Sequence, residues 1–142
     1  MRAVADALWD AFSGAGYSWC GFYTIAAGGE GEEMILGPSR DTPACSPIGL
    51  HGVCGLGYRS GAAIVVPDIR SLGESYVVCD PRDMSEVVVP MLDGPGGVCI
   101  GVIDIDSRDV DAFTDEDAVG LAQVMEAAGL ATPGAELSIV HR

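Results

Sequence analysis

The chain has 142 residues, of which 49% are hydrophobic and 20% charged, a composition typical of one globular domain and not of a disordered segment. Its seven basic residues are all arginine and face 21 acidic residues, which gives a net charge of −14 and disfavours binding to the phosphates of nucleic acid. No apolar run approaches the roughly 20 residues of a membrane helix and the N-terminus has no secretory signal pattern, so we expect a cytoplasmic protein that binds neither nucleic acid nor a membrane.

The first elements predicted along the chain are a helix and a strand. Residues 3–12 carry apolar side chains at helical spacing, which indicates an amphipathic helix. The aromatic and β-branched stretch 17–25 predicts a strand with Trp19 and Tyr23 on one face, and Gly21 between them would leave open space beneath the rings. From these residues alone, core packing and a ligand pocket are equally good interpretations.

A hairpin and a long loop are predicted next. The glycine-rich turn AAGGEGEE leads into a second strand, MILGP, which completes the hairpin. Residues 37–61 contain many glycines and prolines with little periodicity, and they predict a long loop with one short helix after Cys54. Loops of this length in a compact domain usually serve function.

The second half of the chain predicts the centre of the sheet. AAIVVPDI predicts a strand, and SLGESYVVCDPRDMS predicts a second irregular segment. The runs EVVVPML and VCIGVIDIDS, separated by DGPGG, predict a hairpin that is apolar on both faces and therefore central.

The last predicted element is a helix capped by Thr114, with three acidic residues in its first turn and Val119, Ala122 and Met125 facing inward. The tail over 131–142 is expected to be loose. The order of elements predicts an α+β fold: a central antiparallel sheet of about six strands with helices packed on one face.

Two aspartates share one face of the strand VIDIDS. Three residues of the same parity are expected to be buried: Val98, Ile100 and Val102. Two carboxylates on a buried face raise the pKa of at least one of them, which suits a proton donor or a site for a ligand cation at Asp104 and Asp106. The alternative is that the strand simply emerges into solvent after Ile103. Glu86 opens the neighbouring strand and could bring a third carboxylate to the same place.

Five cysteines without a secretory signal favour redox chemistry or metal binding over a static disulfide framework. Cys45, Cys54 and Cys79 fall in irregular, glycine-rich segments that are expected at the surface, where thiols can react. Cys20 and Cys99 fall in apolar strands and are expected to be inert packing residues.

Metal binding is the weaker use of these thiols. His51 and Cys54 are three residues apart and Cys45 is near, a grouping that could hold zinc. No Cys-x-x-Cys pair is present, however, and the spacings match no common zinc pattern. We therefore expect neither a metal nor another bound cofactor.

Motifs spread over residues 19–130 resemble the free methionine-(R)-sulfoxide reductases, which are single GAF-domain enzymes. They occur in the family's order: WCGFY, ILGP, PAC, GVCG, VVPDI, VCD with Ser85-Glu86, VVVPML, GVIDIDS and FTDED. The resemblance implies one GAF domain (PAS/profilin-like) over 1–142, with its core at about 17–130. It also implies reduction of free, not protein-bound, methionine (R)-sulfoxide, regeneration by thioredoxin and, as usual in the family, a homodimer.

Carried over position by position, the resemblance makes Cys79 the nucleophile, Cys45 the resolving cysteine and Cys54 an auxiliary thiol. It places five residues around the substrate: Trp19, Tyr23, Glu86, Asp104 and Asp106. In the implied reaction the Cys79 thiolate attacks the sulfoxide sulfur and one of the three acids supplies a proton to the oxygen. The resulting sulfenic acid then condenses with Cys45 to a disulfide.

The segment from Cys45 to Cys54 is one residue shorter than is usual in the family and has His51 where an arginine is common. This departure bears on whether the loop can bring Cys45 to Cys79. The alternative function is a non-catalytic GAF module that binds a small ligand or reports redox state through its cysteines.

Overall fold

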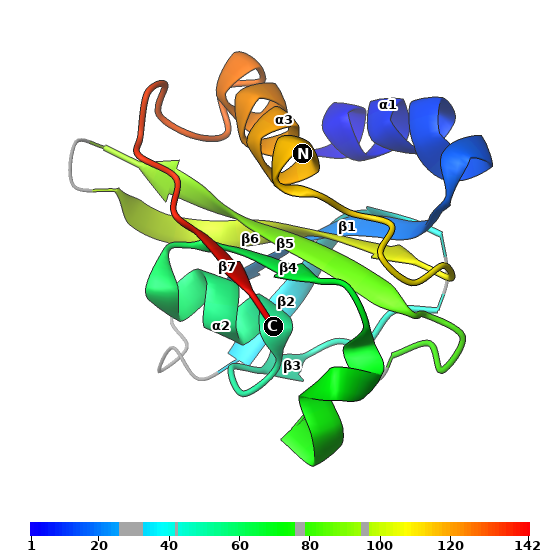
Figure 1. Cartoon of the computed structure of the whole chain (residues 1–142). Coiled ribbons are helices and arrows are strands. Elements are labelled where there is room, and N and C mark those ends of the chain that lie inside the picture. Colours follow the sequence, from blue (N-terminus) through cyan, green and yellow to red (C-terminus); the bar gives the residue numbers. More distant parts are fainter. Residues whose placement is uncertain (26–32, 42, 76–78, 95–96) are drawn as a thin grey trace.

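The computed structural model describes residues 1–25, 33–41, 43–75, 79–94 and 97–142 (Figure 1). The predicted turn AAGGEGEE, except for its last residue, and the middle of the predicted turn DGPGG lie outside the described residues. Among the residues that are described, no helix has both the length and the hydropathy needed to cross a membrane.

In the described part of the chain, seven strands form one sheet in the order β3-β2-β1-β6-β5-β4-β7. The strands are Tyr17–Ile25 (β1), Glu33–Arg40 (β2), Ile48–Gly49 (β3), Ala63–Val66 (β4), Ser85–Asp93 (β5), Val98–Ser107 (β6) and Ile139–His141 (β7). Neighbouring strands are antiparallel except β7, which runs parallel to β4. The predicted α+β fold is confirmed, with one strand more than the expected six.

Two strands lie outside the predicted strand segments: the short β3, in the predicted long loop, and β7, in the C-terminal segment that was expected to be loose. The backbone N–H of Thr132 donates to Leu92 O at 2.8 Å, and β7 then pairs with β4, beginning at the pair Ala63 and Ile139. Without β7, strand β4 would present a row of unpaired backbone groups at the sheet edge. Backbone hydrogen bonds therefore hold the C-terminal tail in place, although its composition had not indicated a regular structure.

Three α-helices of the described residues cover the sheet: Arg2–Phe12 (α1), Val53–Ser60 (α2) and Asp115–Ala127 (α3). Figure 1 shows α1 and α3 on one face of the sheet and α2 on the other. The prediction of helices on one face is therefore wrong for α2. The central strand β5 explains the difference, because its first eight residues are all buried and both of its faces need a cover.

The helix α3 begins as predicted, with Thr114 and Asp117 forming a capping box. Its inward face was predicted less well, because Met125 is fully buried but Val119 is 42% exposed. The buried positions are Ala118, Leu121 and Met125. Apolar residues occur on several sides of this helix, so periodicity alone did not determine which side faces the sheet.

A separate hydrophobic core lies on each face of the sheet. The first, between the sheet and the helices α1 and α3, includes Phe22, Val87 and Ile103. The second, between the sheet and α2, includes Ile64 and Val88. The residues predicted to carry chemistry lie on the face that α2 covers.

Two short 3₁₀ segments complete the described elements, Ser13–Ala15 (η1) and Ile69–Ser75 (η2).

Candidate active site

Strand pairing brings the predicted acids together beneath α2. Glu86 of β5 lies directly opposite Asp106 of β6, and Trp19 of β1 lies opposite Asp106 on the other side. Asp104 pairs with Gly21 in the same ladder. Glu86 is 4% exposed and Asp104 is 7% exposed, so the strand does not simply emerge into solvent after Ile103.

The opposite end of β6 differs from the prediction. Val102 is buried as expected, but Val98 is 66% exposed and Ile100 is 44% exposed. The pairing of β1 with β6 begins only at Gly101, so β1 does not flank these first residues of the strand. Burial on this face is therefore confined to the half of the strand that carries the aspartates.

One pocket contains all but one of the predicted site residues. Seven of them line it: Trp19, Tyr23, Cys54, Cys79, Glu86, Asp104 and Asp106. The eighth, Cys45, is bonded to Cys79 at the pocket's edge. The pattern-based prediction did not include several further lining residues: Pro43, Ala44, Ile48, Gly49, Gly52, Val53 and Asp83.

Two aromatic side chains of β1 form one wall of this pocket. The rings of Trp19 and Tyr23 lie 6.0 Å apart between centroids, and the Tyr23 hydroxyl donates a hydrogen bond to Cys45 O at 2.8 Å. The space expected at Gly21 is filled by the Trp19 indole, because a Cβ at Gly21 would lie 2.6 Å from Trp19 Cζ2. Trp19 Nε1 is buried and has no hydrogen-bond partner among the described residues, so it can donate to a ligand.

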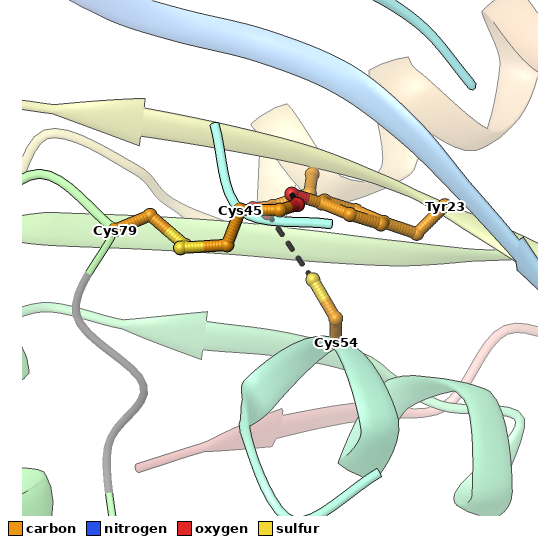
Figure 2. Close-up of a disulfide and its surroundings, with 5 residues drawn as sticks. Tyr23, Cys45, Cys54 and Cys79 are labelled. Atoms are coloured by element: carbon orange, nitrogen blue, oxygen red, sulfur yellow. Dashed lines mark hydrogen bonds between the residues drawn. A yellow bond between two sulfur atoms is a disulfide. The ribbon is translucent and has the colours of Figure 1, made fainter. Parts of the chain in front are cut away.

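A disulfide joins Cys45 to Cys79, with their Cα atoms 5.6 Å apart (Figure 2). The shortened loop that carries Cys45 therefore allows the two cysteines to meet. Cys54 was expected in an irregular surface segment, but it lies in the first turn of α2 and is buried. Its thiol donates a hydrogen bond to Asp104 Oδ2 at 3.1 Å.

The two remaining cysteines lie outside the pocket. Cys20 is fully buried in the core beneath α1 and donates a hydrogen bond to Ala5 O at 3.5 Å, which agrees with a packing role. Cys99 is only half-buried and donates to Gly101 O at 3.1 Å. The expectation that Cys99 is packed inside the protein is thus only partly met, since it lies at the less covered end of β6.

Burial changes the acid–base properties of the pocket. It raises the pKa of Asp104 to about 7, an effect that the hydrogen bond from Cys54 partly offsets. Burial raises the pKa of Asp106 well above its usual value, and the neighbouring charges of Asp104 and Glu86 act in the same direction. The pKa of the Cys54 thiol is also raised well above its usual range, first by burial and then by Asp104. The pocket can therefore hold a protonated carboxylic acid near neutral pH, beside a neutral thiol.

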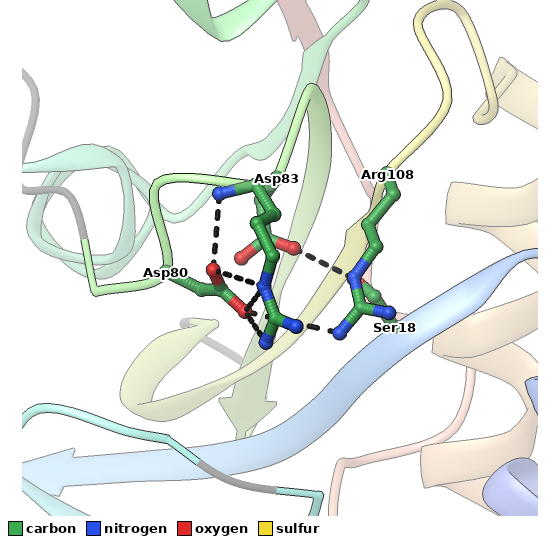
Figure 3. A network of polar contacts seen from close by, with 5 residues as sticks. Ser18, Asp80, Asp83 and Arg108 are labelled. Carbon is green, nitrogen blue, oxygen red and sulfur yellow. Dashed lines mark hydrogen bonds and ion pairs between the residues drawn. The ribbon is translucent and has the colours of Figure 1, made fainter.

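The turn between Cys79 and β5 is held by a polar network (Figure 3). The Arg82 guanidinium donates to both carboxylate oxygens of Asp80, and this hydrogen bonding lowers the pKa of Asp80 to about 2. Arg108 of the chain beyond β6 lies 3.9 Å from the same carboxylate. Ser18 of β1 binds Asp83 from the other side, at 2.8 Å. The segment that carries Cys79 is thus tied to both β1 and β6.

Within the described part of the chain, one group of residues could hold a metal, and it differs from the group considered in the sequence. Cys54 and one carboxylate oxygen each from Glu86 and Asp104 lie within 4.8 Å of one another. The zinc grouping of Cys45, His51 and Cys54 is not formed, because Cys45 is bonded to Cys79 and the His51 side chain is exposed.

No family model matches this chain. The free methionine-R-sulfoxide reductase of Saccharomyces cerevisiae is 34% identical over 120 residues, which are 82% of this chain and 65% of the relative. The chain therefore spans slightly less than two thirds of that relative's length.

Solved structures of similar proteins share the fold. The free methionine-R-sulfoxide reductase of Neisseria meningitidis, determined in complex with its substrate, superposes with a TM-score of 0.77 at 32% identity, over 88% of this chain and 71% of that one. The type II free methionine-R-sulfoxide reductase of Thermoplasma acidophilum gives a TM-score of 0.78 at 28% identity, over 99% of this chain and 94% of that one.

Proposed function

Because this chain belongs to the free methionine-(R)-sulfoxide reductase family, we propose that it reduces free methionine (R)-sulfoxide to methionine with Cys79 as the nucleophile. The observation that carries this proposal is the Cys45–Cys79 disulfide at the edge of a pocket lined by buried carboxylates. A pocket that only bound a ligand would need neither a resolving thiol nor a group able to donate a proton.

The first step transfers oxygen from the substrate to Cys79. The Cys79 thiolate attacks the sulfoxide sulfur, and the oxygen must be protonated for its bond to that sulfur to break. Asp104 suits the role of proton donor, because Cys54 occupies its Oδ2 while the buried Oδ1 has no hydrogen-bond partner among the described residues. As the sulfur–oxygen bond of the substrate breaks, the hydroxyl group moves to the Cys79 sulfur, methionine leaves with the electron pair of its bond to Cys79, and Cys79 becomes a sulfenic acid.

The second step returns Cys79 to its reduced form. The Cys45 thiol condenses with the Cys79 sulfenic acid, so that water leaves and the disulfide forms. A dithiol of the thioredoxin class then supplies two electrons by thiol–disulfide exchange and restores both thiols. Such a reductant operates in a reducing compartment, so we also propose that the protein is located in the cytoplasm.

The remaining polar groups of the pocket can orient the substrate. Trp19 Nε1 can donate a hydrogen bond to a substrate oxygen, since it is buried and without a partner among the described residues. Glu86 and Asp106 lie opposite each other and can bind the α-ammonium group of a free amino acid. A methionine sulfoxide inside a peptide has no such ammonium, which would explain a preference for the free amino acid.

The proposal is tested by supplying the two separated epimers of free methionine sulfoxide to the reduced protein, with dithiothreitol or thioredoxin as reductant. We expect consumption of the R epimer only and no turnover by Cys79→Ser. Turnover by Cys79→Ser would disprove the nucleophile, and binding without turnover by the wild type would favour the non-catalytic GAF module.

A further inference from the structure

Asp83 is a fourth carboxylate in the pocket, beyond the three acids already given roles. It is 4% exposed and lines the pocket together with Cys79 and Glu86. It lies on the turn between these two residues, where its backbone N–H donates to Asp80 O at 3.2 Å. An ionisable side chain with so little exposure needs a partner or a function.

The Asp83 carboxylate is held at one oxygen only. Ser18 Oγ donates a hydrogen bond to Asp83 Oδ1 at 2.8 Å, and no other hydrogen bond to this side chain occurs among the described residues. Asp80, three residues earlier on the same turn, is a different case. Its carboxylate pairs with Arg82 and Arg108, and it does not line the pocket. Oδ2 of Asp83 is therefore available to a group that enters the pocket.

The residues that line the pocket indicate the charge of the ligand group that Asp83 would bind. It contains four carboxylic acids but no arginine, lysine or histidine among the described residues. Burial raises the pKa of Asp83 and the charge of Asp80 acts in the same direction, while the hydrogen bond from Ser18 and the charges of Arg108 and Arg82 act to lower it. A cation that approaches Oδ2 favours the ionised form of this carboxyl group, so a cationic part of the ligand would find its counter-charge there.

We propose that Asp83 binds the α-ammonium group of the free amino acid and so contributes to the selectivity of the pocket against N-blocked and peptide-bound methionine sulfoxide. This inference rests on the proposed function, in which Glu86 and Asp106 also face that group. Asp83 differs from them because it lies four residues from Cys79 on the same turn. Binding of the ammonium by Asp83 therefore also orients Cys79 over the substrate.

The inference is tested by equilibrium binding in the Cys79→Ser background, where no turnover occurs. Calorimetry would give the dissociation constants of free L-methionine (R)-sulfoxide and of its N-acetyl derivative, with and without Asp83→Asn. Because a hydrogen bond to a charged group is lost, we expect Asp83→Asn to weaken binding of the free amino acid by about tenfold. Binding of the N-acetyl derivative, which has no ammonium, should not change.

Two matched variants separate this role from a merely structural one. Asp10→Asn removes an exposed carboxylate of α1, outside both the pocket and the polar network of the turn, and should leave both dissociation constants unchanged. Ser18→Ala keeps the charge of Asp83 but releases its Oδ1, and should weaken binding of the free amino acid by less than Asp83→Asn does.

The inference is overturned if Asp83→Asn binds the free amino acid as tightly as its parent, or loses affinity equally for both ligands. The proposed function fails separately, if the wild-type protein binds free methionine (R)-sulfoxide but does not reduce it.

Discussion

The thiol of Cys54 and Oδ2 of Asp104 form a buried hydrogen bond of 3.1 Å between α2 and the centre of the sheet. The bond joins residues that are 50 positions apart in the chain and fixes the orientation of one carboxyl group in the pocket. With Oδ2 held in this way, Oδ1 is the oxygen that can exchange a proton with a ligand. Cys54 therefore has a structural reason to be present that does not require it to take part in the redox cycle.

Substitution of Cys54 tests this relationship. A serine hydroxyl can also donate to Asp104, so Cys54→Ser should keep turnover with dithiothreitol close to that of the wild type. Cys54→Val removes the donor, so Asp104 Oδ2 loses its partner and the carboxyl group is no longer held in one orientation, which should lower kcat by about tenfold, the size of one lost hydrogen bond. Equal loss of turnover in both variants would show instead that the thiol itself is needed.

The raised pKa of Asp104 predicts the pH dependence of the chemical step. A proton donor with a pKa of about 7 is protonated below that pH and loses its proton above it. Because the wild type and Asp104→Asn share Cys79, the ratio of their rates of methionine release in a single turnover reports on the proton donor alone. We expect this ratio to be large below about pH 7 and to fall as pH rises through that value. A ratio that stays constant across this range would exclude Asp104 as the donor.

Loss of Cys45 should affect turnover with thioredoxin more than turnover with dithiothreitol. Cys45→Ser cannot form the disulfide that thioredoxin opens, so turnover with thioredoxin should be abolished. Dithiothreitol can reduce a sulfenic acid directly, so part of the turnover with that reductant should persist, and the sulfenic acid should be trapped by a dione reagent. Cys99→Ser is the matched control, because Cys99 does not line the pocket, and it should behave as the wild type with both reductants.

Gly21 is expected to be essential for the position of Trp19. A Cβ at residue 21 would lie 2.6 Å from Trp19 Cζ2 and 2.7 Å from Ser39 Cβ. Gly21→Ala should therefore lower the free energy of unfolding by about 1–3 kcal/mol through overpacking, and weaken substrate binding as Trp19 moves.

Gly120 provides the control for this substitution. It lies within α3, and a Cβ there would meet nothing within 4 Å. Gly120→Ala should raise the free energy of unfolding by up to about 1 kcal/mol, because alanine favours the helix more than glycine does. Chemical denaturation would give the free energy of unfolding of both variants, and binding measurements would give their affinity for the substrate. Equal stability of the two variants would contradict the role given to Gly21.

Local patterns predicted the elements whose periodicity is regular. The alternation of β1 correctly placed Trp19 and Tyr23 on one face, and the alternation of β6 did the same for Asp104 and Asp106. The short helix predicted after Cys54 is present as α2, but its glycine-rich sequence gave no sign of which face of the sheet it covers. The helix forms there because Gly57 allows it to approach the sheet closely, with a Cβ at that position only 2.9 Å from Val88 Cγ1.

Asp83 was not predicted, because it lies outside regular structure and no periodicity relates it to the other acids. The only signal in the sequence was its position between Cys79 and Glu86. Its carboxylate is held by Ser18, which is 65 residues away in the chain.

The sequence by itself determined the fold class, the residue types able to carry redox and acid chemistry, and the strand faces on which they lie, because these follow from composition and from periodicity along a strand. The resemblance implied that Cys45 pairs with Cys79, as the structure shows, but only the tertiary structure decided that Cys54 binds Asp104 and that a fourth carboxylate completes the pocket. These features arise from contacts between segments far apart in the chain. Strand register and the packing of α2 determine such contacts, and neither leaves a local pattern in the sequence.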